Sequence, residues 1–79
     1  MSKSSSYFLL TNLKDKKDAE KIKTYIGKIP GVLSVSVNPE NSRLAVDYDD
    51  TGVSFENISK TIKQLGYDIK SDKNEEHIM

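Results

Sequence analysis

The chain has 79 residues and a mass of 8.9 kDa, which is enough for one small domain and leaves no room for a second. Its 12 basic residues balance its 12 acidic residues, and this balance argues against a nucleic-acid binder that works by bulk charge. The chain contains no cysteine, which excludes disulfides, zinc fingers and thiolate catalysis. No apolar run approaches the roughly 20 residues of a membrane span, and residues 1–6 lack the apolar stretch of a signal peptide. We therefore expect a cytoplasmic protein that binds neither membrane nor nucleic acid.

Both ends of the chain are rich in small or charged residues. We expect residues 1–6 to be disordered and residues 71–79 to be a flexible tail, because polar termini fray unless something holds them. The folded domain is then expected to span residues 7–70, and a core of this size must be efficient.

The first half of that domain predicts a strand followed by a helix. Residues 7–13 are a short apolar run of strand character, with Phe8 and Leu10 on one face. The period then changes, and one helical stripe carries Ala19, Ile22, Ile26 and Ile29. Asp15 fits the N-cap of this helix, and Asp18, three residues later, resembles the second member of a capping box.

Two strands, a second helix and a short last strand follow. Residues 32–38 alternate, with Leu33, Val35 and Val37 on one face. Turn residues 39–42 lead to a third strand, whose inward side chains are Leu44, Val46 and Tyr48. Ser54 fits the N-cap of the second helix, and residues 67–69 form the last strand. The second helix presents the stripe Phe55, Ile58, Ile62 and Leu65.

The element order is β-α-β-β-α-β, and its two halves resemble each other. A shift of 36 residues places Phe8 on Leu44 and Ile22 on Ile58. A duplicated strand-helix-strand unit with right-handed crossovers gives an α+β domain of the ferredoxin-like class. We expect a four-stranded antiparallel sheet with both helices on one face and a solvated opposite face.

Four segments of the chain carry a family resemblance: Ile29–Val32 (Ile-Pro-Gly-Val), Leu33–Asn38, Leu44–Tyr48 and Ile62–Ile69. From about Tyr7 to Ile69 the chain resembles the heavy-metal-associated domain of copper chaperones and of the N-terminal tails of metal-pumping P-type ATPases. Members of this family carry Met-x-Cys-x-x-Cys after the first strand, and the two thiolates bind a soft cation, usually Cu(I). Counted back from Gly31, the methionine falls on Leu13 and the cysteines fall on Asp15 and Asp18.

The resemblance and the residues together lead to two hypotheses. The first is a non-catalytic interaction or regulatory module that has lost thiolate Cu(I) binding and needs no cofactor. The resemblance implies a partner such as a metal-transporting ATPase or a chaperone. The interaction surface would consist of Leu13, Lys14, Lys16, Lys17 and Tyr67. Lysines at a helix start oppose the helix dipole, and a patch that costs stability is sometimes functional.

The second hypothesis is an accessory protein for metal binding or metal transport. Its ligands would be the carboxylates of Asp15 and Asp18, or His77 and Met79 in the tail. Carboxylates suit hard ions rather than Cu(I), and three lysines near Asp15 and Asp18 repel a cation. An enzyme is not expected, because the only histidine lies in the tail and no acid–base pair or phosphate loop can be assembled.

Overall fold

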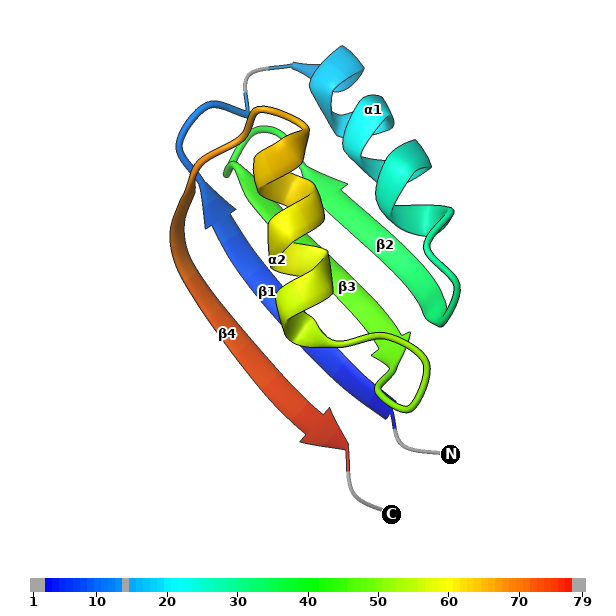
Figure 1. Cartoon of the computed structure of the whole chain (residues 1–79). Coiled ribbons are helices and arrows are strands. Elements are labelled where there is room, and N and C mark those ends of the chain that lie inside the picture. Colours follow the sequence, from blue (N-terminus) through cyan, green and yellow to red (C-terminus); the bar gives the residue numbers. More distant parts are fainter. Residues whose placement is uncertain (1–2, 14, 78–79) are drawn as a thin grey trace.

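The computed structural model describes residues 3–13 and 15–77, and of residues 76 and 77 it describes only the backbone. The sheet has the strand order β2-β3-β1-β4 with antiparallel neighbours, and both helices cover one face of it (Figure 1). This arrangement confirms the ferredoxin-like α+β fold. The elements are β1 (Lys3–Leu10), α1 (Lys16–Gly27), β2 (Val32–Asn38), β3 (Arg43–Asp49), α2 (Phe55–Gln64) and β4 (Ile69–His77).

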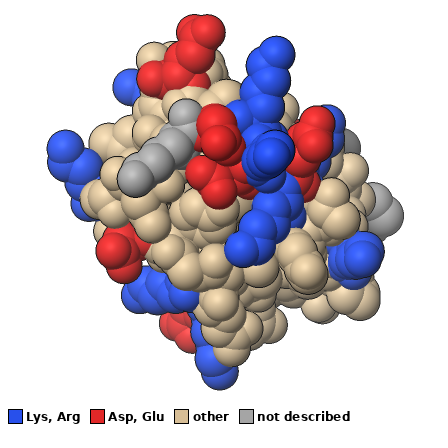
Figure 2. Space-filling model, turned by 90° about the horizontal axis from the view of Figure 1, so that it is seen from above, with Lys and Arg blue, Asp and Glu red and all other residues tan. Residues whose placement is uncertain are grey.

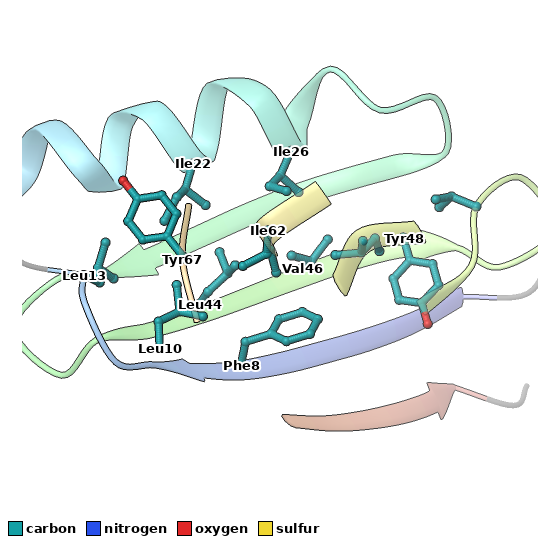
Figure 3. Packing of buried hydrophobic residues seen from close by; sticks show 12 residues of the cluster. Phe8, Leu10, Leu13, Ile22, Ile26, Leu44, Val46, Tyr48, Ile62 and Tyr67 are labelled. Carbon is teal, nitrogen blue, oxygen red and sulfur yellow. The ribbon is translucent and has the colours of Figure 1, made fainter. Parts of the chain in front are cut away.

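The core lies between the helices and the sheet, and its residues come from the predicted stripes. Both isoleucines at the centre of each helical stripe, Ile22 and Ile26 in α1 and Ile58 and Ile62 in α2, are fully buried. The ring of Phe8 in β1 stacks on that of Phe55 at 5.4 Å between centroids. Figure 3 shows Leu13 and Tyr67 at one end of the core and Tyr48 at the other. The predicted inward faces of β1 and β3 are confirmed.

The two polar termini are part of the sheet, so the expectation of a disordered segment and a flexible tail is wrong for residues 3–6 and 71–77. β1 begins at Lys3, which pairs with Asp49 of β3 and with His77 of β4. The serines of β1 are buried as apolar residues would be: the Ser4 hydroxyl donates to Asp50 Oδ2 at 2.7 Å, and the Ser6 hydroxyl donates to Asn74 Oδ1 at 2.8 Å. These hydrogen bonds allow polar residues to occupy inward positions. Residues 1–2 and 78–79 lie outside the described residues.

The inward face of β2 also differs from the prediction at one position. The pairing between β2 and β3 shifts between Val32 and Ser34, which is the signature of a β-bulge. The bulge turns Leu33 outward, where 53% of its surface is exposed, and Val32 packs against the core instead. Val35 and Val37 keep their predicted inward orientation.

Candidate interaction site at the loop between β1 and α1

The loop that follows β1 is fixed by hydrogen bonds to two other loops. It lies at the end of the molecule opposite the two termini (Figure 1). Asn12 bridges it to the segment after α2: its Nδ2 donates to the Gly66 carbonyl at 3.0 Å, and its Oδ1 accepts from the Asp68 N–H at 3.2 Å. The Ser42 hydroxyl, in the turn between β2 and β3, donates to the Leu13 carbonyl at 3.1 Å. Sequence analysis missed Asn12, because its only signal was a lone amide next to an apolar run.

Asp15 caps α1, as predicted. Its backbone is extended and its Oδ1 accepts a hydrogen bond from the Asp18 N–H at 3.1 Å. This is the N-cap geometry in which a short side chain satisfies one of the free N–H groups of the first helical turn. One of the two carboxylates that the metal hypothesis requires therefore already serves the helix.

Asp18 and Tyr67 form the central contact of the site. The Tyr67 hydroxyl donates to Asp18 Oδ1 at 2.7 Å, across 49 residues of sequence. Only 5% of Tyr67 is exposed, and burial, followed by the hydrogen bond and the charge of Asp18, raises the pKa of Tyr67 to about 12. The carboxylate that we interpreted as part of a capping box thus ties α1 to the segment before β4.

The predicted interaction surface separates into buried and exposed members. Leu13 and Tyr67 are 4% and 5% exposed, so these two side chains lie beneath the surface rather than on it. Lys16 and Lys17 are exposed, whereas Lys14 lies outside the described residues. Figure 2 shows this end of the molecule, where basic and acidic side chains are interspersed.

The two sets of proposed metal ligands lie at opposite ends of the sheet. Asp15 and Asp18 belong to the loop end, whereas His77 pairs with Lys3 at the end of the two termini. Met79 and the His77 side chain lie outside the description. Within residues 3–13 and 15–75, no three Asp, Glu or His side chains gather closely enough to hold an ion.

Three aspartates near the end of β3 resemble a carboxylate cluster in the sequence, but each has its own role. Asp49 Oδ1 accepts from the hydroxyl and the N–H of Thr51, which lowers the pKa of Asp49 and forms the turn before α2. Asp47 accepts hydroxyl hydrogen bonds from Ser5 and Ser34, and Asp50 accepts one from Ser4. The arrangement stabilises the sheet and the turn.

Comparison with known proteins identifies the family. Residues 8–68 match the family described as "Heavy-metal-associated domain", which is more than half of the chain. The chain belongs to this family. The copper chaperone CopZ of Staphylococcus epidermidis is 37% identical over 49 residues, which are 62% of this chain and 72% of that protein. CopZ of Staphylococcus aureus is 35% identical over 48 residues, which are 61% of this chain and 71% of that protein.

Solved structures agree with the fold. A structure described as "CopZ metallochaperone" superposes with a TM-score of 0.79 and 26% identity, and the match covers 82% of this chain and 97% of that one. The Cu(I)-loaded N-terminal domain of a potential copper-translocating P-type ATPase from Bacillus subtilis superposes with a TM-score of 0.76. Its 21% identity, over 92% of both chains, supports the fold alone.

The donor atoms at the loop of this chain do not fit the family's soft cation. Cu(I) selects thiolate and thioether sulfur, and the chain has no cysteine. The side chain of Leu13 offers no ligand atom, and Oδ1 of both Asp15 and Asp18 is hydrogen-bonded within the fold. In addition, none of the described helices is both long enough and apolar enough to cross a membrane.

Proposed function

We propose that this protein is a non-catalytic heavy-metal-associated domain that acts as an interaction or regulatory module and has lost thiolate Cu(I) binding. One observation carries the proposal: at the family's metal position, Asp15 caps α1 and Asp18 accepts the Tyr67 hydroxyl. Both residues contribute to folding of the loop without an ion. The loop is therefore prepared for contact rather than for metal transfer.

The proposed partner is a metal-transporting ATPase or a chaperone. A copper chaperone and an ATPase N-terminal domain are among the similar proteins, which supports a partner from metal transport. The contact would be made by Lys14, Lys16 and Lys17, together with the buried Leu13 and Tyr67. Lysines at the start of α1 oppose the helix dipole, so they do not stabilise the helix and are better explained by a partner with an acidic surface.

A metal titration tests the loss of metal binding. The isotope-labelled protein is titrated anaerobically with Cu(I), Zn(II) and Mn(II), and the amide NMR signals are followed residue by residue. We expect no saturable shift in residues 13–19 or at Tyr67, and the same result for an Asp15→Asn, Asp18→Asn double variant. Saturable shifts in that loop, lost in the double variant, would refute the proposal. Saturable shifts confined to residues 75–77 would instead support the alternative of a metal-handling accessory protein with ligands near His77.

A binding measurement tests the surface in the same preparation. The probe is the purified N-terminal domain of a copper-translocating P-type ATPase. Reversing both charges with Lys16→Glu and Lys17→Glu should weaken binding roughly tenfold, because like charges would then face an acidic partner. The matched control is Lys60→Glu with Lys63→Glu, two exposed lysines on α2, which should leave binding unchanged. Equal effects of the two pairs would contradict the proposed surface.

A further inference from the structure

The two edges of the sheet differ in their protection against other strands. β2 and β4 are the outer strands. β4 carries charged side chains on both faces, including the ion pair of Lys73 with Glu75 at 3.0 Å, and such charges disfavour pairing with a further strand. β2 contains no charged residue and no proline in its seven residues. The edge of β2 is therefore the one suited to accept another strand.

The pairing pattern shows which peptide groups of β2 are free. The Leu10 N–H donates to the Ser42 carbonyl at 2.8 Å, which fixes the alternation of β3 between its two neighbours. Leu44 and Val46 of β3 then point their peptide groups toward β1, and Ala45 and Asp47 point theirs toward β2. Because Val35 is opposite Val46 and Val37 is opposite Leu44, the peptide groups of Val35 and Val37 point away from the sheet. These two residues offer donors and acceptors to an added strand.

An exposed apolar side chain lies on the same strand. Leu33, turned outward by the bulge, is 53% exposed, more than either of the other exposed large hydrophobic residues, Tyr7 and Tyr25. Removing such a side chain from water favours association. Leu33 and the free peptide groups together provide an apolar contact and a hydrogen-bonding template on one edge.

A basic rim overhangs this edge. α1 packs over β2 (Figure 1), and Lys16 and Lys23, two helical turns apart, share one side of it. Glu20 lies about 40–60° further around the helix, so this side carries a net charge of +1. Asp18 lies on the opposite side of α1, about 160° around the helix from Lys16 and about 140° from Lys23, and faces Tyr67 in the interior. The Lys16 and Lys23 side therefore faces outward above the free edge. Both lysines are exposed, and neither takes part in an ion pair with any described residue.

We infer that the β2 edge binds an extended segment of a partner protein by strand addition, and that this segment carries acidic side chains toward α1. Charge complementarity with Lys16 and Lys23 selects an acidic segment. A second copy that presents its own β2 is disfavoured, because it would bring a second basic rim against the first. This surface goes beyond the proposed function, since it uses the strand edge rather than the loop.

The experiment uses the full chain and a synthetic peptide of alternating valine and glutamate, about as long as β2. We expect saturable amide shifts in Val32–Asn38 and slower hydrogen exchange at Val35 and Val37, the two free N–H groups. A peptide of alternating valine and lysine should bind at least roughly tenfold more weakly, because it meets like charges on α1. Shifts confined to residues 13–19 would overturn the inference and leave the loop surface standing.

Variants distinguish peptide binding at the β2 edge from binding at the loop surface. Lys23 is outside the loop surface, and Lys23→Glu should weaken binding of the acidic peptide several-fold. Val35→Pro removes one free N–H. Leu33→Glu removes the apolar contact and adds a negative edge charge that repels the acidic peptide, without touching the core, so it serves if the proline variant does not fold. Asp72→Pro on β4 is the matched control and should bind normally. Equal binding of the acidic peptide by Leu33→Glu and the unchanged protein, or concentration-dependent self-association without peptide, would overturn the inference.

Discussion

Each end of the hydrophobic core is closed by a buried tyrosine whose hydroxyl donates to a polar side chain (Figure 3). At the loop end, Tyr67 donates to Asp18 Oδ1 at 2.7 Å. At the end of the two termini, Tyr48 donates to Asn74 Oδ1, also at 2.7 Å. The two hydrogen bonds have the same length, but one acceptor is a carboxylate and the other a neutral amide.

The two acceptors have different roles at the two ends of the core. Asn74 Oδ1 accepts from both Tyr48 and Ser6, so one side chain satisfies two buried hydroxyls and holds β4 against β1. Asp18 instead adds a negative charge at the family's metal position, and the state of its contact depends on pH through Tyr67. We interpret the terminal end as the part that stabilises the fold and the loop end as the part left free to specialise.

The largest expected effect is at the terminal end. Tyr48 and Ser6 are only 1% and 0% exposed. Asn74→Ala leaves their two buried hydroxyls without their common acceptor. An unsatisfied buried hydroxyl costs about 1–3 kcal/mol. We expect the free energy of unfolding, measured in urea, to fall by about 2 kcal/mol or more. Asp72→Ala, an exposed residue of the same strand, is the control, and an equal loss there would remove the special role of Asn74.

A smaller and pH-dependent effect is expected at the loop end. Tyr67→Phe removes one hydrogen bond to a partly exposed carboxylate, which should cost about 1 kcal/mol at neutral pH. The folded pKa of Tyr67, about 12, lies above its ordinary value of about 10. The contribution of the Tyr67 hydroxyl is therefore complete below pH 10 and is lost as the pH rises through 12.

Unfolding of the two proteins at a series of pH values measures this dependence. The stability difference between the unchanged protein and Tyr67→Phe should stay constant up to about pH 10 and then shrink. Subtracting the variant removes the titration of the lysines, which both proteins share. A difference that stayed constant to pH 12 would show that folding does not raise the pKa of Tyr67.

Much of the fold was predictable because its signals are local. The isoleucine stripes of the two helices have helical period, and Asp15 and Ser54 mark the two N-caps by residue type alone. The order of elements and the resemblance then determined the topology. These features depend on residues within a few positions of one another, which is the range that sequence periodicity covers.

The errors concern contacts between distant residues. Ser4 and Ser6 read as a polar terminus, because their partners Asp50 and Asn74 lie 46 and 68 residues away. The outward turn of Leu33 depends on a bulge against β3, which alternation within β2 does not reveal. At the site, the cap by Asp15 was predicted, whereas the Asp18–Tyr67 contact and the bridge by Asn12 required the folded chain.

Asp18→Asn tests whether the charge of the acceptor is what distinguishes the two ends. An amide Oδ1 can still accept the Tyr67 hydroxyl, so the free energy of unfolding should change by less than about 1 kcal/mol. The pKa of Tyr67 should fall from about 12, because the carboxylate no longer disfavours the tyrosinate, but should stay above its ordinary value because burial persists. NMR titration of the Tyr67 ring measures this pKa. Asp15→Asn, which keeps the N-cap and removes a more distant charge, should lower the pKa less. An unchanged pKa in Asp18→Asn would mean that the charge of Asp18 does not contribute to raising it, and the loop end would then differ from the terminal end in position but not in chemistry.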